Sequence, residues 1–425
     1  MKIRTFPIPS EEAEAHLRRL AGRARVLFDG EAARVAGRAL SEIRRGGDRA
    51  LARWRARYDG VTGPPRAVRR PGRVSAEFRR AFDQSLSRVT LFHSHQQTPA
   101  ARVVTAGSVI EERVFPLDSV GVYIPGGQAV YVSTALMTIL PARLAGVPRI
   151  AVATPPPAYD SSPELRYALK KLGVTEVYRM GGAHAIAALA VGTGAVPGVA
   201  CIVGPGNRFV AAAKRLVSGL VRIDGLSGPT EVAVYADGAA DAECVAADLL
   251  AQAEHDRDAA AVLVTTSAPL AERVEKAITR RLVGLETRDR ARAALSRYGA
   301  IAIAKSPREA VLFLEAFAPE HLGIQTRKSL EDSRLFRRAG AVFVGRPTSE
   351  VFGDYVAGTN HVLPTNGTAR FSSALSVRDF VKRMSVVSLS RRDAERLAPH
   401  AEVWARIEGL PAHAAAARLR RSAGS

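Results

Sequence analysis

The sequence predicts an α/β fold in which strands and helices alternate in two consecutive series. Short β-branched runs alternate with helical stretches from residue 120 to residue 224, and a second series runs from residue 231 to residue 344. Alternation at this spacing favours parallel sheets with helices on both faces. The flanking residues show helical periodicity instead. We therefore expect two incomplete Rossmann-like units between a helical N-terminal segment and a helical C-terminal tail.

The N-terminal segment is expected to span residues 1–118. Apolar positions recur at helical spacing over Ala32–Ile43, and Gly46-Gly47 stops this helix. Asp48 then caps a second helix that ends at Asp59-Gly60, and a third helix covers Ser75–His95. This segment shows no chemistry of its own.

The two α/β units are expected at residues 119–229 and 230–375. Strands of the first are predicted at Val120–Ile124, Ile150–Ala153, Thr175–Tyr178, Ala200–Val203 and Val221–Asp224. Strands of the second are predicted at Glu231–Tyr235, Ala261–Thr265, Ala300–Ala304 and Ala341–Val344. The two series share no clear sequence identity, so a duplication is a hypothesis from the pattern alone. In the tail, residues 376–425, apolar spacing predicts helix at Val377, Phe380, Val381 and Met384.

The composition is typical of a globular protein, with 47% hydrophobic and 24% charged residues. No apolar run reaches the length of a membrane span, and the N-terminus lacks the apolar core of a signal peptide. Cys201 and Cys244 are the only cysteines, so no disulfide framework holds the fold. We therefore expect a cytoplasmic protein without a membrane partner.

The formal net charge of +20 raises the question of a nucleic-acid partner. The excess is mostly arginine scattered along amphipathic helices, and no zinc-finger, basic-zipper or RNP-type pattern is present. We expect no nucleic acid as a partner.

Two glycine-rich turns follow strands of the first series, at Tyr123–Gly127 and Val203–Asn207. Glycine lets the backbone approach a phosphate closely, and a helix that starts at Asn207 offers free N–H groups. Neither turn is a full G-x-G-x-x-G fingerprint. An ordinary tight turn explains each of them equally well.

Gln252 and His255 lie three residues apart near the end of a predicted helix, so their side chains share one face. This pair is either half of a metal site or a chance pairing. Glu320 and His321 stand side by side in a loop after a helix, where a histidine and a glutamate can move protons. A surface ion pair is the alternative reading.

Two later segments carry further polar groups. Asp354 is either a metal ligand or a helix cap, and His361 in the same glycine-bearing loop is either a ligand or a structural group. Glu408 and His413 are separated by a Gly-Leu-Pro bend, so both side chains can face one point.

These residues lie in stretches that, in this order, resemble the histidinol dehydrogenase family nearly end to end. The stretches are Val122–Gly127, Gly204–Asn207, Leu250–His255, Pro319–Leu322, Gly353–Tyr355 with Gly358–Thr365, Thr368–Ser373 and Glu408–Ala414. The resemblance implies oxidation of L-histidinol to L-histidine with two molecules of NAD, the last steps of histidine biosynthesis.

The resemblance implies a zinc ion in each subunit, with the ligands Gln252, His255, Asp354 and His413. Oxygen and nitrogen donors suit a site that accepts further ligands. In the family the metal binds the imidazole and amino groups of the substrate, so it orients the substrate. The implied substrate contacts are Thr230, Gln252, His255, His321, Asp354, Glu408 and His413.

The resemblance also assigns the catalytic roles. Glu320 matches the residue that activates water for the second oxidation, and His321 matches the residue that moves protons. A cysteine nucleophile is the rival route to aldehyde oxidation. Cys201 lies in a predicted strand and Cys244 early in a predicted helix, neither in a matched motif, so we reject the thiol route.

For NAD, the implied contacts are Tyr123, His184 and Asn207. The family usually has glutamine at the position of His184, and histidine can still donate a hydrogen bond there. A second departure is Thr230, which stands where the family has a serine that contacts the substrate. Its hydroxyl is kept, but the added methyl group could crowd the ligand.

The resemblance further implies an intertwined homodimer, in which Glu408 and His413 come from the second subunit, so that sites are shared. The alternative is a related zinc- and NAD-dependent dehydrogenase of another small alcohol, such as a sulfonated diol. Such relatives are expected to keep the metal ligands and lose the substrate end. Because this chain keeps Thr368–Ser373 and Glu408–His413, we favour histidinol.

Overall fold

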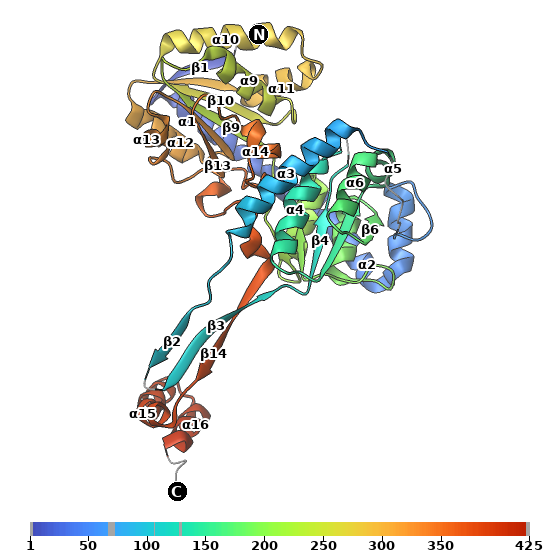
Figure 1. Cartoon of the computed structure of the whole chain (residues 1–425), viewed down its shortest axis with the longest axis vertical. Helices are drawn as coiled ribbons and strands as arrows, with labels where there is room; N and C mark the ends of the chain where they lie inside the picture. Colours follow the sequence, from blue (N-terminus) through green and yellow to red (C-terminus); the bar gives the residue numbers. More distant parts are fainter. Residues whose placement is uncertain (1–2, 67–72, 106, 127–129, 422–425) are drawn as a thin grey trace. The chain divides into compact units, whose positions relative to one another are not determined.

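The computed structural model describes residues 3–66, 73–105, 107–126 and 130–421 (Figure 1). The chain divides into two units. Unit 1 contains the chain up to Gln96 together with Asp118–Phe380, and unit 2 contains Gln97–Leu117 together with the chain from Val381 onward. Each unit is described by itself below. None of the described helices is long and apolar enough to cross a membrane.

The first sheet of unit 1 is wholly parallel, in the order β6-β5-β4-β7-β8. Its strands are β4 (Ser119–Tyr123), β5 (Arg149–Thr154), β6 (Glu176–Arg179), β7 (Cys201–Val203) and β8 (Arg222–Ile223). The helices are α4 (Val132–Leu144), α5 (Pro156–Ser161), α6 (Pro163–Lys171), α7 (Gly182–Val191) and α8 (Arg208–Val217). The chain leaves β4 toward β5 and returns on the other side at β7, so the strand order reverses between β4 and β7. In open α/β sheets this is where ligands bind, at the carboxyl ends of the strands.

The second sheet of unit 1 is also parallel, in the order β1-β11-β10-β9-β12-β13. Its strands are β1 (Arg4–Ile8), β9 (Glu231–Ala236), β10 (Ala260–Thr265), β11 (Ala300–Ala304), β12 (His321–Gln325) and β13 (Ala341–Val344). The helices are α9 (Ala242–Ala253), α10 (Ala268–Val283), α11 (Arg288–Tyr298), α12 (Pro307–Phe317), α13 (Ser329–Ser333) and α14 (Glu350–Tyr355).

Both sheets therefore repeat one topology, apart from the added edge strand β1, and the predicted fold class is confirmed. The strands β1 and β12 were missed. The sequence of β12, HLGIQ, is short and contains a glycine, which weakens its strand signal. Parallel pairing with β9, about 90 residues earlier in the chain, forms β12 nonetheless.

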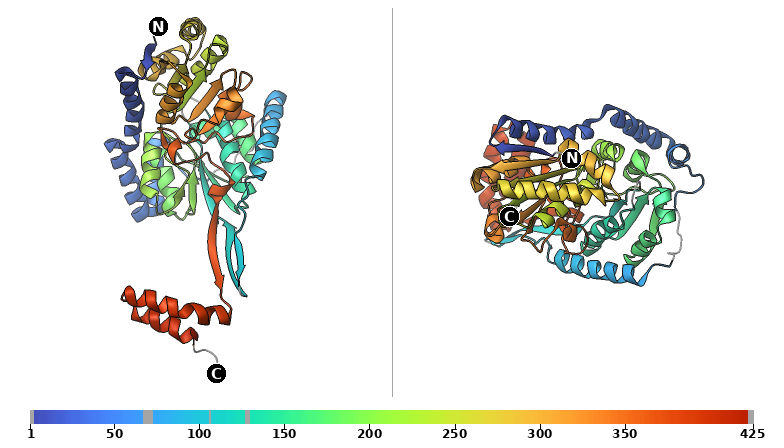
Figure 2. Two further views of the ribbon diagram at one scale, coloured as in Figure 1. Left: turned by 90° about the vertical axis from the view of Figure 1, so that its left-hand side faces the viewer. Right: turned by 90° about the horizontal axis from the view of Figure 1, so that it is seen from above.

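The helices of the N-terminal segment are α1 (Glu11–Gly22), α2 (Gly30–Tyr58) and α3 (Ala76–Ser94). Gly47 interrupts α2 with a φ of 49°, which confirms the predicted stop. Alanines and Leu51 on the buried face of α2 pack against α7 and α8 in one hydrophobic cluster. The dark blue helices and the light blue α3 lie on opposite sides of unit 1 in both views of Figure 2.

Unit 2 contains an antiparallel sheet in the order β14-β3-β2, followed by two helices. The strands are β2 (Arg102–Thr105), β3 (Ser108–Pro116) and β14 (Val381–Ser388), and the helices are α15 (Arg391–Ile407) and α16 (Pro411–Arg421). Figure 1 shows the long strands β3 and β14 side by side. The predicted C-terminal helices are confirmed.

The prediction of helix around Val381 and Met384 was wrong. Val377–Phe380 is a short 3-10 turn, and Val381–Ser388 is the strand β14. The apolar spacing in this stretch also fits an extended chain. The partner β3 lies about 270 residues earlier in the chain, so local periodicity carries no sign of the pairing.

Candidate active site

Glu320 and His321 lie at the amino end of β12, which pairs with β9 in the second sheet. Ala318 ends α12 in a left-handed conformation with a φ of 52°, and Pro319 then leads the chain into β12. There, Glu320 accepts hydrogen bonds from the hydroxyl of Thr230 (2.5 Å) and from the backbone N–H of Glu231 (2.9 Å). The pair is buried, so the structure rejects the reading of a surface ion pair.

The imidazole of His321 is oriented by the backbone of Glu231 at the start of β9. Its Nδ1 lies 2.9 Å from the backbone carbonyl oxygen of Glu231 and donates to it, which leaves Nε2 as the reactive nitrogen. Nε2 is buried without a hydrogen-bond partner and lies 3.6 Å from Oδ1 of Asp354. An unpaired nitrogen inside the protein can accept a proton from a bound molecule.

The charges around this pair set its proton affinity. Burial lowers the pKa of His321, but the negative charges of Glu320 and Asp354 outweigh this effect and raise that pKa to about 9. Burial raises the pKa of Glu320, partly offset by the charge of His321. The pKa values of both groups are therefore raised above their ordinary values.

A buried ion pair between Arg23 and Glu231 holds the backbone of Glu320 in place. The carboxylate of Glu231 lies 2.5 Å from the guanidinium of Arg23 and also accepts from the backbone N–H groups of Glu320 (3.2 Å) and Asn366 (3.1 Å). Burial raises the pKa of Glu231 to about 7; Arg23 opposes this rise and the charge of Glu320 adds to it. This ion pair was not predicted from the sequence, since 208 positions separate its members.

Thr230 links Glu320 to the first of the predicted metal ligands. The amide nitrogen of Gln252 donates to the hydroxyl oxygen of Thr230, and that hydroxyl donates its own hydrogen to Glu320. The amide orientation of Gln252 is thereby fixed, and its carbonyl oxygen is the atom not used by this bond. An oxygen donor held in this way fits the chemistry of a zinc ligand.

Asp354 lies near the end of α14, which contacts α9. Gln252 lies in the last turn of α9, whereas His255 lies in the turn that follows this helix, so the two residues do not share a helix face as predicted. Burial raises the pKa of Asp354, but the hydrogen bond and charge of His321 and the charges of His361 and His255 lower it overall. His361 donates its Nδ1 hydrogen to the backbone oxygen of Asp354 (2.9 Å). This bond gives His361 a structural role.

Among the described residues, no group of three or more histidine, cysteine, aspartate or glutamate side chains is arranged to hold a metal ion. Two features of the predicted zinc site explain this. Gln252 contributes an amide rather than one of these side chains, and His413 belongs to unit 2. The side chains of Gln252, His255 and Asp354 in unit 1 offer oxygen and nitrogen donors, which are donor types that zinc accepts.

Glu408 and His413 flank the turn between α15 and α16 in unit 2. Glu408 is the C-cap of α15, Gly409 turns the chain with a φ of 71°, and His413 lies in the first turn of α16. Both side chains are exposed. They are therefore accessible to a partner molecule.

The predicted NAD contacts gather near the carboxyl edge of the first sheet, where the strand order reverses. Tyr123 ends β4, and its hydroxyl accepts from the N–H of Gly182 at the start of α7 (3.0 Å). Gly204 has a φ of 114°, and a Cβ there would lie 2.1 Å from the carbonyl oxygen of Tyr123, so only glycine fits. Asn207 caps α8 through its Oδ1. Gly127 of the other glycine turn lies outside the described residues.

Two buried pairs that the sequence analysis missed support this edge. Nε2 of His184 lies 2.7 Å from the carboxylate of Asp59, which also accepts from the N–H of Gly181. His184 therefore has only Nδ1 left for another partner. The second pair is the Lys214–Asp224 ion pair, which holds the turn after β7 at Gly204. Lys214 donates to the carbonyl oxygen of Gly204 (3.0 Å), and Asp224 accepts from the N–H of Gly204 (2.7 Å).

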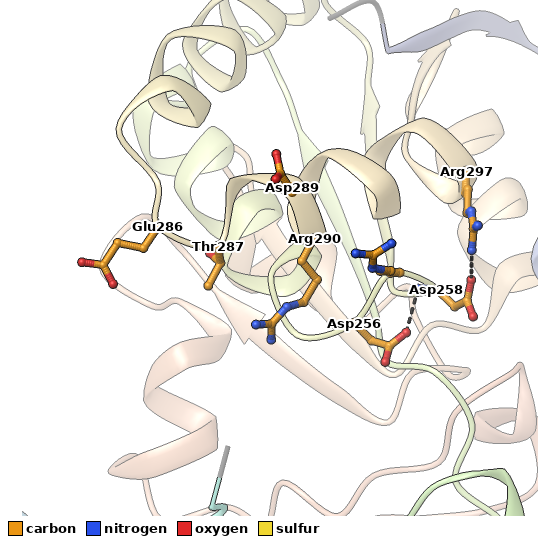
Figure 3. Close-up of a pocket in the computed structure, with 8 residues that line it drawn as sticks. Asp256, Asp258, Glu286, Thr287, Asp289, Arg290 and Arg297 are labelled. Carbon is orange, nitrogen blue, oxygen red and sulfur yellow. Dashed lines mark hydrogen bonds and ion pairs between the residues drawn. The ribbon is translucent and has the colours of Figure 1, made fainter. Parts of the chain in front are cut away.

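A cavity of about 660 Å³ opens beside the loop that follows His255 (Figure 3). Its charges are of both signs and partly neutralise one another, as in the contact between Arg297 and Asp258 (2.9 Å). It is lined by Asp256, Arg257, Asp258, Glu286, Thr287, Asp289, Arg290 and Arg297. None of the predicted site residues lines it, so we assign it no part in the site.

The chain has two parallel sheets of one strand order, and the second sheet carries a buried glutamate–histidine pair. These features define the chain as an α/β enzyme. Residues 26–421 match the family model described as histidinol dehydrogenase. The chain belongs to the histidinol dehydrogenase family.

Individual relatives cover most of the chain. It is 44% identical over 393 residues to the histidinol dehydrogenase of Geobacillus kaustophilus, covering 91% of this chain and 93% of the relative. It is 47% identical over 340 residues to that of Caulobacter vibrioides, covering 80% and 78%. The crystal structure of histidinol dehydrogenase from Elizabethkingia anophelis superposes with a TM-score of 0.88 at 30% identity, covering 98% of both chains.

Proposed function

We propose that the chain oxidises L-histidinol to L-histidine by two successive hydride transfers to NAD. The observation that carries the proposal is the buried Glu320–His321 pair, locked by the backbone of Glu231 and connected through Thr230 to Gln252. The relatives that match most of the chain are named histidinol dehydrogenases, which supports this substrate over other small alcohols.

Zinc is the proposed metal, and Gln252, His255 and Asp354 would hold it together with the partner subunit's His413. When bound, the metal supplies an anchor for the imidazole and amino groups of the substrate. The fixed amide of Gln252 and the lowered pKa of Asp354 keep both oxygen donors ready to bind a cation.

His321 and Glu320 are the proposed proton carriers. In the first oxidation, the neutral form of His321 takes the proton of the substrate hydroxyl at Nε2 while the hydride leaves for NAD. The resulting aldehyde must add water, because only a tetrahedral carbon bearing hydrogen can release a second hydride. As that water adds, Glu320 accepts one of its protons and His321 returns its own proton to the aldehyde oxygen. The neutral His321 then takes a hydroxyl proton of the hydrate as the second hydride leaves.

The structure supports this route over a thiol nucleophile. Cys201 is buried in β7 and Cys244 is half-buried in α9, and both are free. Burial raises the pKa of Cys201 to about 12, so its reactive thiolate form is negligible at neutral pH.

NAD is proposed to bind at the carboxyl edge of the first sheet, contacting Tyr123, His184 and Asn207. The start of α8 offers backbone N–H groups to a phosphate, beside the strand-order reversal between β4 and β7. Because Asp59 occupies Nε2 of His184, the cofactor would use Nδ1 of that ring.

Homodimerisation is proposed to complete each site, with the partner subunit's Glu408 contacting the substrate amine. The exposure of Glu408 and His413 supports this sharing.

The test is the rate of NADH formation by the zinc-loaded protein with L-histidinol and with sulfonated diols. We expect turnover with histidinol and at most traces with the diols. Turnover with a sulfonated diol but not with histidinol would assign the chain to the alternative activity of a related dehydrogenase.

A further inference from the structure

A pair of buried carboxyl groups lies one helical turn before two of the proposed metal ligands. Asp248 precedes Gln252 by four residues on α9, and Glu350 precedes Asp354 by four residues on α14. Residues at this spacing lie on the same helix face. Asp248 is 7% exposed and Glu350 is 3% exposed, so both carboxyl groups are inside the protein.

Ser349 bridges the two carboxyl groups. Its hydroxyl oxygen lies 2.8 Å from Oδ1 of Asp248 and 3.3 Å from Oε2 of Glu350. Asp248 accepts a second bond from the amide of Gln325 at the end of β12 (2.8 Å). Three elements, α9, α14 and β12, are therefore joined at this point.

Two ionised carboxylates would need more hydrogen-bond donors than the side chains around them supply. The hydroxyl of Ser349 carries one hydrogen, so it can donate to only one of its two neighbours. No ion pair among the described residues includes Asp248 or Glu350. Two buried negative charges so close together, neither of them in an ion pair, would be strongly unfavourable, so one of the carboxyl groups carries a proton.

Glu350 is the group that carries it. Asp248 has two donors, as an ionised carboxylate requires, whereas Oε1 of Glu350 is buried with no partner. Burial raises the pKa of Glu350 to about 8; the charge of Asp248 on α9 adds to this, that of His321 on β12 opposes it, and that of Asp354 on its own helix adds.

We propose that Glu350, as a neutral acid, donates to Ser349, which donates to Asp248, and that this relay fixes α14 so that Asp354 stays beside His321. Glu350 is then a positioning residue for the reaction, acting through Asp354. The part of the inference that concerns catalysis rests on the proposed function, while the protonation state of Glu350 does not.

The first test measures protonation without any turnover. Infrared difference spectra of the metal-free protein at pH 6.5 should show a protonated-carboxyl band that is lost in Glu350→Gln and kept in the control Glu331→Gln, which changes an exposed glutamate on α13. A spectrum of Glu350→Gln identical to wild type in this region would overturn the proposal.

The second test uses the pH dependence of the melting temperature. The folded pKa of Glu350 lies above the unfolded value of about 4.3, so its stabilising contribution is present at low pH and is lost as pH rises toward 8. Relative to wild type, Glu350→Gln should therefore gain in Tm between pH 5 and pH 8, and Glu331→Gln should not. Parallel Tm curves for wild type and Glu350→Gln would contradict the relay.

The third test concerns positioning. Glu350→Ala should lower kcat with histidinol about 10- to 100-fold, as loss of support behind a metal ligand does, with a matching loss of zinc on dialysis. Glu350→Gln, which can still donate to Ser349, should restore both. Equal loss in the two variants would overturn the positioning role, and an inactive wild type would refute the proposed function while leaving the infrared result intact.

Discussion

At the scale of single residues, the backbone of Glu231 fixes both side chains of the proposed proton-transfer pair. Its N–H binds Glu320 and its carbonyl oxygen binds His321, so neither side chain depends on a flexible neighbour for its orientation. The side chain of Glu231 then binds the backbone of Glu320 from the other direction. This arrangement leaves Nε2 of His321 as the free atom at which a substrate proton can arrive.

His321→Ala should lower kcat by about 10²- to 10⁴-fold and leave the KM for histidinol within a few-fold of wild type, since a proton carrier acts on the reaction step. Steady-state NADH formation measures both. His95→Ala, a change at an exposed histidine of unit 1, is the control and should behave as wild type. A loss confined to KM would contradict the assignment.

Arg23→Met should destabilise the protein by about 3–5 kcal/mol at pH 8, because it leaves the buried carboxylate of Glu231 unpaired. The penalty should shrink at pH 6, where Glu231, with its pKa raised to about 7, takes a proton. Urea unfolding at both pH values measures this. The double variant Arg23→Met/Glu231→Gln should recover much of the stability at pH 8, and no recovery would refute the pairing.

At the scale of elements, the two sheets share one strand order but use opposite edges. The proposed NAD contacts lie at the carboxyl edge of the first sheet, as the rule for open α/β sheets predicts. Thr230 and Glu320 immediately precede β9 and β12, at the amino edge of the second sheet. The helix α9 returns the chain to that edge, which brings Gln252 to Thr230.

The strand–helix alternation, the stop at Gly47 and the side chains of the proposed active site were accessible from the sequence, because each depends on local patterns or short motifs. The strand β14 was not, because its partner is distant and its own periodicity is ambiguous. The supporting contacts of Arg23 with Glu231 and of Asp59 with His184 were not accessible either. They join positions 208 and 125 residues apart, and no local pattern in the sequence links the two members of either pair.

Asp59→Asn should raise the KM for NAD about 10-fold or more, since it removes the charge-assisted bond that orients His184 at the start of α7. The KM for histidinol should stay unchanged, because Asp59 supports the first sheet only. Initial rates with either substrate varied measure the two constants. A rise in the KM for histidinol alone would show that this edge does not bind the cofactor.

At the scale of the whole molecule, the proposed site needs residues from both units of the chain. Gln252, His255 and Asp354 belong to unit 1, and Glu408 and His413 belong to unit 2. If a second subunit supplies the last two, a chain with a defect in one unit can be complemented by a chain with a defect in the other.

Mixing inactive His321→Ala and His413→Ala proteins should therefore restore activity. Random exchange of subunits makes about half of the dimers hybrids, and each hybrid has one of its two sites intact. The mixture should therefore show about one quarter of wild-type activity. Activity assays after co-refolding measure this, with each variant refolded alone as the control. No recovery, despite hybrid dimers isolated through a tag on one chain, would show that each site is built within one subunit.

The most direct measurement of the central claim is the amount of NADH formed per histidinol consumed at completion. The account predicts two NADH and one histidine for each histidinol, since Glu320 and His321 serve both oxidations. One NADH with accumulation of the aldehyde, or no NADH at all, would contradict it.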